Sequence, residues 1–294
     1  MRKKKILLTG VKTWINLIAD NLDSIRAKTI VNRKWNNFSN FKKFKKAFGY
    51  KIIHYFWACK NPQELRMFKK LGKKIINYYI GSDVCLEAQK DPENARLCAS
   101  ICDKTICDSP NLQKELASIG IESEVIQNPV PNLVYGNEPF PEENCVLGYV
   151  SSINENFYCV DEIEKIASLC PDWKFLIVHH DGTGRKPPPN LEYLGFQNHD
   201  DMTRLLNKSR IYLRFTKHDA TGKLGLEAMA LGRYVVRNMK WDHTVFADSP
   251  EKAAREIEKL KNIEELNLPG QNYVKKEWDH KITYGRFRRL YEEI

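Results

Sequence analysis

Residues 218–232 read His-Asp-Ala-Thr-Gly-Lys-Leu-Gly-Leu-Glu-Ala-Met-Ala-Leu-Gly. Gly222 and Gly225 let the backbone approach a ligand closely, and a helix that begins here directs free N–H groups and its positive dipole end at an anion. Glu227, about one turn into that helix, is placed to accept hydrogen bonds from vicinal hydroxyls such as those of a ribose. With Asp219 as a second carboxylate across the turn, the stretch predicts a binding site for a sugar nucleotide.

Short β-rich runs alternate with amphipathic helical stretches on both sides of this motif. The alternation is typical of a parallel sheet with helices on both faces, and it occurs twice. We therefore expect an α/β protein with two Rossmann-like, doubly wound domains. The predicted strands are Lys5–Thr9, Lys28–Val31, Lys51–Trp57, Lys73–Ile80, Lys104–Asp108, Ser123–Ile126, Cys145–Val150, Trp173–Val178, Leu191–Leu194, Ile211–Phe215 and Tyr234–Arg237.

A proline-rich segment, Asn128–Glu143, separates the two sets of strands. Its prolines exclude a regular helix or a central strand, so we expect a linker there. The predicted organisation is an N-terminal domain over residues 1–128, a linker over 129–143, a second domain over 144–279 and a terminal helix over 280–294.

Length and composition agree with two domains, because 294 residues with 42% hydrophobic content can bury two ordinary cores. The start resembles a signal peptide only at its charged end, since the apolar run that follows breaks at Thr9-Gly10. No uninterrupted apolar run approaches the ~20 residues of a membrane span. We expect a cytoplasmic protein.

The net charge of +10 is unevenly distributed along the chain. Residues 1–140 hold 24 Lys and Arg against 13 Asp and Glu, whereas residues 141–294 hold 23 against 24. A basic half can face nucleic acid, an anionic membrane or an acidic substrate, and it can also be a plainly solvated lysine-rich surface.

The segment Phe38–Phe48 interleaves four phenylalanines with four lysines. At helical spacing the aromatic side chains fall near one face and the lysines around the rest. Either the aromatic face packs on the first sheet and the lysines are solvated, or the helix makes peripheral contact with the anionic inner face of the membrane.

Eight cysteines raise the question of a metal site, and the tightest group is Cys98, Cys102 and Cys107. Their spacing disfavours zinc, because no Cys-x-x-Cys is present and no histidine lies nearby. His179 and His180 are adjacent in a strand and point to opposite faces, so they do not share an ion. We expect buried structural thiols and no metal or other cofactor.

The stretch 218–232 resembles a signature of the retaining, family 4-like GT-B glycosyltransferases, in which Glu, seven residues and a second Glu precede Ala-Met-Ala-x-Gly. Here the pair reads Asp219 and Glu227. Other segments resemble the same family in the same order: Tyr79–Val84, Asp108–Pro110 with Val125–Val130, and Leu194–Phe196. The resemblance implies two Rossmann-like domains facing a cleft, with the last helix crossing back to the first domain.

By this resemblance Glu227 binds the nucleotide ribose and Asp219 contacts the donor sugar and steadies charge near the anomeric carbon. The alternatives are a surface pair of Glu227 with Lys223 and a helix cap formed by Asp219. The other residues predicted to bind the donor are Lys223, Gly222, Leu224, Arg214, Ser151 and Gly10.

The sequence departs from the family after the first strand of the second domain, where the usual Arg and Lys are missing from Ser151–Asn156. Other cations must then neutralise the donor phosphates, and the candidates are Lys223, Arg214, Lys217 and Arg185. If none does, the site is weakened or non-catalytic.

Two polar residues of the first domain follow or lie within predicted strands. Asp83 is a candidate to position or deprotonate the acceptor, with a loop-capping carboxylate as the alternative. His54 is expected to be a hydrogen-bonded core histidine.

The resemblance implies a retaining, metal-independent glycosyltransferase that moves a sugar from a nucleotide-diphosphate donor to a saccharide or lipid-linked acceptor. The alternative is a non-catalytic GT-B subunit that binds a sugar nucleotide or a partner enzyme. A nucleic-acid-binding protein is a third interpretation, and steep salt dependence of DNA binding would support it.

Overall fold

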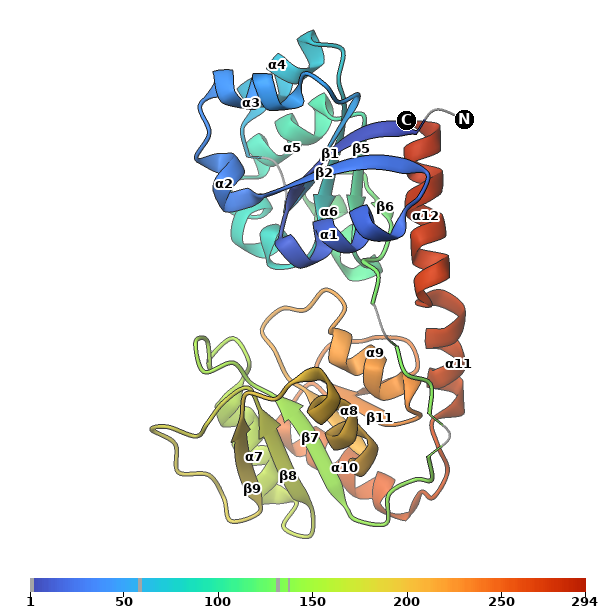
Figure 1. Ribbon diagram of the computed structural model, residues 1–294. Coiled ribbons are helices and arrows are strands. Elements are labelled where there is room, and N and C mark those ends of the chain that lie inside the picture. The colour runs from blue at the N-terminus through green and yellow to red at the C-terminus, as the bar shows by residue number, and fades with distance from the viewer. Residues whose placement is uncertain (1–2, 58–59, 131–132, 137) are drawn as a thin grey trace. The chain divides into compact units, whose positions relative to one another are not determined.

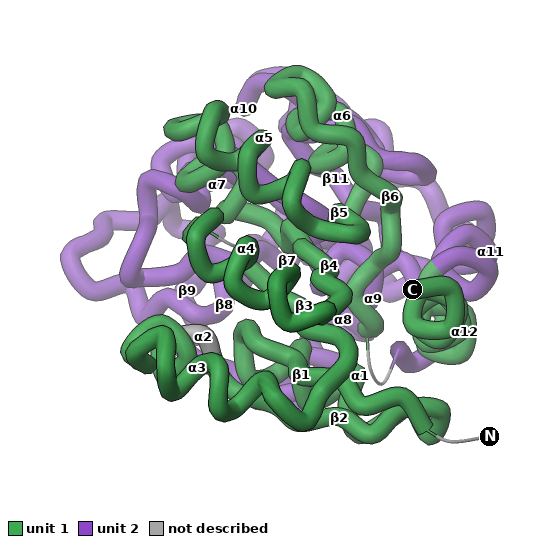
Figure 2. Tube along the Cα trace, turned by 90° about the horizontal axis from the view of Figure 1, so that it is seen from above, with its two compact units in different colours: residues 1–131, 278–294 green, residues 132–277 purple. Residues whose placement is uncertain are grey.

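The computed structural model describes residues 3–57, 60–130, 133–136 and 138–294. Two compact units share the chain, unit 1 with residues 1–131 and 278–294 and unit 2 with residues 132–277 (Figure 2). Outside the described residues lie Met1, Arg2, Ala58, Cys59 and, from the predicted linker, Pro131, Asn132 and Asn137.

Unit 1 is built on a six-stranded parallel sheet with the strand order β2-β1-β3-β4-β5-β6 (Figure 1). Its strands are β1 (Lys4–Gly10), β2 (Ile25–Val31), β3 (Ile52–Phe56), β4 (Lys74–Tyr79), β5 (Lys104–Cys107) and β6 (Glu124–Val125). Its helices are α1 (Lys12–Asn21), α2 (Asn32–Asn36), α3 (Asn40–Ala47), α4 (Pro62–Lys70), the π-helix η1 (Val84–Ala88), α5 (Pro92–Ile101), α6 (Pro110–Ser118) and α12 (His280–Glu293).

Unit 2 contains a second six-stranded parallel sheet, in the order β12-β11-β10-β7-β8-β9. Its strands are β7 (Cys145–Tyr149), β8 (Lys174–Val178), β9 (Leu191–Gly195), β10 (Ile211–Arg214), β11 (Tyr234–Arg237) and β12 (Val245–Phe246). Its helices are α7 (Val160–Leu169), α8 (His199–Lys208), α9 (Lys223–Ala230), α10 (Pro250–Lys259), the 3-10 turn η2 (Leu260–Asn262) and α11 (Leu268–Glu277). Two parallel sheets flanked by helices confirm the predicted fold class.

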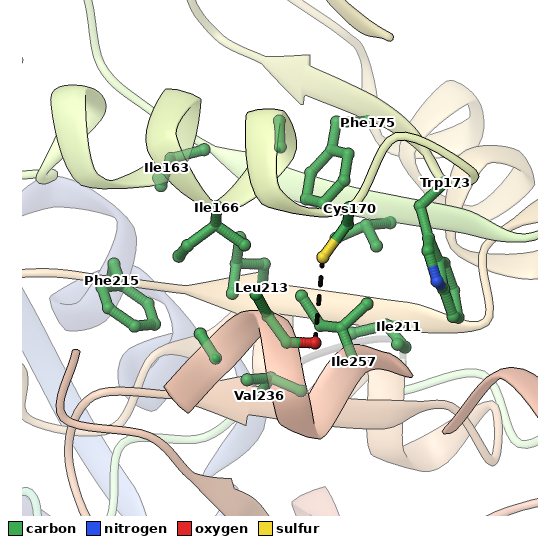
Figure 3. Close-up of a cluster of buried hydrophobic side chains, with 14 of the residues drawn as sticks. Ile163, Ile166, Cys170, Trp173, Phe175, Ile211, Leu213, Phe215, Val236 and Ile257 are labelled. Carbon is green, nitrogen blue, oxygen red and sulfur yellow. Dashed lines mark hydrogen bonds between the residues drawn. The ribbon is translucent and has the colours of Figure 1, made fainter. Parts of the chain in front are cut away.

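Burial on both faces explains why the strands of unit 1 read as continuous apolar runs. Successive strand residues point to opposite faces, so Ile6 and Leu8 of β1 join the core beneath α1 and α12, while Leu7 joins the core beneath α2 to α5. The core of unit 2 is formed in the same way, with α7 and α10 meeting on one face of the sheet (Figure 3). There Cys170 Sγ contacts the carbonyl oxygen of Ala254 at 3.8 Å.

The last helix, α12, belongs to unit 1, as the sequence predicted. Its residues Phe287, Leu290 and Tyr291 are buried in that unit's core. Tyr291 Oη lies 2.7 Å from Nδ1 of His54, which is fully buried on β3. Burial lowers the pKa of His54 to about 3, so this histidine is a neutral core residue.

Helix α3 corrects one interpretation of the segment 38–48. Its buried residues are Lys43 and Ala47, whereas Phe41 and Phe48 are 77% and 71% exposed. These two aromatic side chains therefore do not pack on the first sheet. The reason is ionic, because Lys43 turns inward to pair with the buried carboxylate of Glu64 on α4.

The Glu64 carboxylate joins three elements of unit 1. In addition to Lys43, it accepts hydrogen bonds from Trp35 Nε1 of α2 at 2.9 Å and from Tyr55 Oη of β3 at 2.5 Å. All four side chains are buried, so each polar group depends on the others for its partner.

We predict that Glu64→Leu lowers the free energy of unfolding by about 3 kcal/mol or more, because it leaves the Lys43 ammonium buried without a counter-charge. Urea unfolding measures the loss. Adding Lys43→Met should recover much of it. The exposed neighbour offers a matched control, since Lys42→Met should change stability by less than about 0.5 kcal/mol. Equal losses in the single and double variants would contradict this account.

Candidate functional site

The carboxyl ends of parallel strands meet at one edge of a sheet, which is where open α/β sheets bind ligands. In unit 2 this edge carries Arg237 at the end of β11, Arg214 at the end of β10 and Tyr149 at the end of β7. Because β11, β10 and β7 are neighbours in the sheet, their final side chains form a row.

The loop that follows β10 ends at Gly222, immediately before α9. Gly222 has φ +69°, a conformation that side chains rarely adopt, and an added Cβ would lie 2.7 Å from Asp219 Oδ2. Glycine is therefore required here both by the backbone and by the proximity of the Asp219 carboxylate. Gly225 is buried one turn later with only ordinary contacts around it.

Asp219 lies between two arginine side chains. Its Oδ1 accepts a hydrogen bond from Arg214 Nη2 at 3.1 Å, and its Oδ2 accepts from Arg214 Nε at 3.1 Å and from Arg237 Nη2 at 2.8 Å. One carboxylate facing two guanidinium groups leaves a net charge of +1. Burial opposes the charged carboxylate, but the two arginines hold the pKa of Asp219 below its ordinary value.

The side chains of the two arginines differ in their exposure to solvent. The side chain of Arg214 retains 13% exposure and that of Arg237 only 3%. Arg214 can therefore meet a ligand directly, whereas Arg237 supports it from behind. Sequence reasoning named Arg214 and missed Arg237, which the strand-end rule would have found had it been applied to β11 as well as to β10.

Two of the other cations considered for phosphate binding are already engaged. Arg185 donates to Glu164 at 2.6 and 3.0 Å, to Asp161 at 2.5 Å and to Glu155 at 3.4 Å. Lys217 pairs with Glu162 at 3.2 Å. The Arg185 guanidinium faces three carboxylates, so it is not available to a phosphate.

Lys223 and Leu224 form the first turn of α9, and both are half-buried. Glu227 lies one turn further along the helix and is also half-buried. Burial raises the pKa of Glu227, opposed by the charges of Lys223 and His199. Ser151 follows the end of β7, where its carbonyl accepts a hydrogen bond from the Asn154 N–H at 3.0 Å. The structure thus places these four residues in unit 2 with Asp219 and Arg214.

A series of rings continues the row beyond Arg214. The guanidinium carbon of Arg214 lies 5.4 Å from the ring centre of Tyr158, which is 5.2 Å from that of Tyr149. Tyr149 stacks on His179 at 5.0 Å, and His179 lies 5.7 Å from Phe196. Phe196 follows β9 and is 77% exposed. The edge of the sheet is therefore cationic at β10 and β11 and aromatic at β7 to β9.

The other two predicted residues, Gly10 and Asp83, belong to unit 1. Gly10 ends β1, where an added Cβ would lie 2.3 Å from Phe56 Cβ, so close strand packing alone requires glycine. Asp83 is fully buried and accepts hydrogen bonds from the N–H groups of Ile80 and Gly81 at 2.8 to 3.2 Å. This is the geometry of a loop-capping carboxylate.

The sequence leads us to expect no metal ion, and the grouping of possible metal-ligating side chains bears on this expectation. Within the described ranges, no three His, Cys, Asp or Glu residues are grouped so that they could hold an ion. His180 instead contacts Glu155 at 2.7 Å, separately from His179. In the same ranges, no helix has the length and apolar character needed to span a membrane.

Comparison with protein-family models gives no match, and no curated protein matches the sequence. Solved structures do match. The HepE protein of Anabaena in complex with UDP is 13% identical, with a TM-score of 0.75 over 99% of this chain and 100% of that one. Sucrose-phosphate synthase from Thermosynechococcus elongatus is 13% identical, with a TM-score of 0.73 over 99% of each chain. A glycosyltransferase from Rickettsia africae is 14% identical, with a TM-score of 0.73 over 100% and 99%.

These likenesses extend over essentially the whole chain and define its fold. The protein has the GT-B glycosyltransferase fold, which confirms the fold that the sequence resemblance implied. At 13 to 14% identity the likeness establishes the fold, and the reaction has to be argued from the site.

Asp83 provides a prediction on pH. Burial raises the pKa of Asp83 to about 7, above its unfolded value, so the folded state binds the proton more tightly. The stabilisation that the protonated Asp83 carboxyl contributes to the folded state is present at low pH and is lost as the pH rises through about 7. Between about pH 5.5 and 8 the wild type should lose about 2 kcal/mol more than Asp83→Asn, which keeps an acceptor for both N–H groups.

Urea unfolding of the two proteins at both pH values measures this difference. Parallel pH dependence in the wild type and Asp83→Asn would show that Asp83 is ionised throughout the range.

Proposed function

We propose that this protein is a retaining, metal-independent glycosyltransferase that transfers a sugar from a nucleotide-diphosphate sugar to a hydroxyl acceptor. Unit 2 binds the donor, and unit 1 binds the acceptor. The acceptor is a saccharide or a lipid-linked saccharide, which places the reaction in polysaccharide or glycolipid synthesis. The structures of HepE with UDP and with UDP-glucose support a nucleotide-sugar donor for this fold.

The observation that carries the proposal is the Arg214–Asp219–Arg237 cluster beside the start of α9. A leaving diphosphate needs its charge neutralised in the transition state. The cluster supplies a net positive charge, and α9 adds its free N–H groups and positive dipole end. We infer that these groups do the work of the Arg and Lys that the loop Ser151–Asn156 lacks.

The other side chains at this edge of the sheet suit the ribose and the base of a nucleotide. Glu227, in the second turn of α9, can accept hydrogen bonds from the ribose hydroxyls. The exposed ring of Phe196, backed by His179 and Tyr149, offers a flat surface to a nucleobase. Diphosphate, ribose and base would then follow the sheet edge from its cationic to its aromatic part.

The contacts of Asp219 modify the role expected from the resemblance. Both of its oxygens already accept hydrogen bonds from arginine, so little capacity is left for sugar hydroxyls. We therefore propose that Asp219 is a positioning residue that holds Arg214 against the diphosphate. The leaving diphosphate, and not a carboxylate, accepts the proton of the incoming hydroxyl.

A non-catalytic GT-B subunit remains the second candidate, favoured by the missing basic pair and by Asp at position 219. It predicts weak or absent nucleotide binding and no turnover.

We predict that the full chain binds one nucleoside diphosphate in calorimetric titrations with UDP, GDP and ADP, and that magnesium leaves the affinity unchanged. Glu227→Gln and Arg214→Ala should each weaken binding by about tenfold or more, because each removes a hydrogen-bonding group from the ribose or diphosphate site.

The matched control is Glu258→Gln, which changes an exposed glutamate of α10 in the same unit and should alter the affinity by less than about twofold. If no nucleotide binds, the non-catalytic interpretation replaces this one. If binding occurs, proton NMR of the product made with the matching donor sugar reports whether the anomeric configuration is kept.

The role of Asp219 is tested by measuring the affinity of Asp219→Asn for UDP and, separately, for a UDP-sugar. A positioning residue acts through the arginines, so Asp219→Asn should weaken both ligands by a similar factor, about fivefold or more. A direct contact with the sugar would weaken only the UDP-sugar and leave UDP unaffected. Circular dichroism melting of the variant verifies that it is folded in the titration.

A further inference from the structure

One surface of unit 1 has a composition that the donor site does not explain. Residues 32–74 contain thirteen Lys and Arg residues and a single acidic residue, Glu64. Glu64 is buried and bound by Lys43, so it adds no negative charge to the surface. Within this stretch of sequence the cations are almost uncompensated.

Some of these cations have partners elsewhere in unit 1. Lys60 pairs with Glu87, and Lys69 and Lys74 both pair with Asp103. In the part of the chain that the structure describes, no carboxylate forms a salt bridge with the remaining cations of α3 and α4, which are Lys42, Lys45, Lys46, Arg66 and Lys70.

Exposed aromatic side chains lie among these cations. Phe41 and Phe48, 77% and 71% exposed, occupy the side of α3 that faces away from the buried Lys43 and Ala47. Phe44 is half-buried between them and lines a groove of about 400 Å³ against α4. Met67 and Leu71 form the rest of the apolar lining, with Arg66 and Lys70 beside them. We call Phe41, Phe48 and the five cations the α3–α4 surface.

We propose that the α3–α4 surface docks on an anionic lipid bilayer. Phe41 and Phe48 enter the interface between headgroups and acyl chains, and the lysines extend along the surface to meet lipid phosphates. Burying two large exposed rings removes apolar surface from water, and the cations add attraction to negative headgroups. This inference goes beyond the proposed reaction and does not depend on it.

A lipid surface fits this composition better than a nucleic acid. Of the thirteen cations in residues 32–74, only Arg33 and Arg66 are arginines. Arginine is the residue whose planar fork binds phosphate in two places, whereas lysine carries a compact charge on a flexible stem that suits a fluid layer of headgroups. The two exposed phenylalanines have no polar atom to read a base edge.

The test is flotation of the full chain with two kinds of vesicles, phosphatidylcholine alone and phosphatidylcholine with about one-third phosphatidylglycerol. The wild type should bind only the anionic vesicles, more weakly as salt rises. Lys45→Glu with Lys46→Glu should reduce binding by about tenfold or more, and so should Phe41→Ser with Phe48→Ser. Both Phe side chains are exposed, so the second variant should keep its circular dichroism spectrum.

The chain provides a matched control in Lys275→Glu with Lys276→Glu. These are also adjacent lysines in the last turn of a helix, α11 of unit 2, and both are exposed. The control carries the same change in net charge and should bind the anionic vesicles within about twofold of the wild type.

Three results would overturn the proposal. The first is failure of the wild type to bind anionic vesicles. The second is an equal loss in the two charge-reversal variants, which would show attraction by net charge alone. The third is tighter binding to unrelated double-stranded DNA that is insensitive to Phe41→Ser with Phe48→Ser, which would assign the surface to nucleic acid. Nucleotide titration is separate, so the proposed reaction can fail without affecting these outcomes.

Discussion

The charge balance of unit 2 at the carboxyl edge of its sheet depends on the Asp219 carboxylate. Without Asp219, Arg214 and Arg237 would place two like charges at the ends of neighbouring strands, one of them nearly inaccessible to water. With it, each guanidinium has a hydrogen-bonded counter-charge and the group keeps a single surplus positive charge. Gly222 belongs to the same constraint, because only glycine leaves room for the carboxylate at the turn into α9.

This arrangement supports the proposed diphosphate site, although the loop after β7 lacks cations. Charge at a phosphate site has to be fixed in place before the ligand arrives if it is to favour the transition state. A lysine in a loop would have to be ordered on binding, whereas Arg214 is already held in a bidentate contact by Asp219 and backed by Arg237. Arg185 shows the opposite case, a cation so completely engaged by acidic residues that it serves only the architecture of unit 2.

Sequence patterns predicted the fold well because most of its information is local. Strands buried on both faces read as apolar runs. The strand pattern and the glycine turn before α9 can be recognised without knowing how the side chains pack. Elements without such a signal were missed. The two-residue strand β12 is one of them, because two residues are too few to show a strand pattern. The second strand was predicted over Lys28–Val31, but the structure begins β2 at Ile25.

Side-chain pairing was harder to predict than the elements because it joins residues far apart in sequence. Arg237 reaches Asp219 across 18 residues, and no spacing rule within residues 218–232 includes it. Likewise, Glu227 and Lys223 could be placed on α9 from the pattern, whereas the engagement of Arg185 by Asp161 and Glu164 could not.

The inward turn of Lys43 shows how a buried ion pair can determine what a surface presents. Helical periodicity in residues 38–48 separates an aromatic side from a basic side, and hydrophobicity alone would bury the aromatic one. Glu64 reverses this choice, because its buried carboxylate, held by Trp35 and Tyr55, needs a cation and Lys43 supplies it. A helix that directs residue 43 at the core must direct residues 41 and 48 away from it. The exposure of Phe41 and Phe48 therefore follows from the Lys43–Glu64 pair.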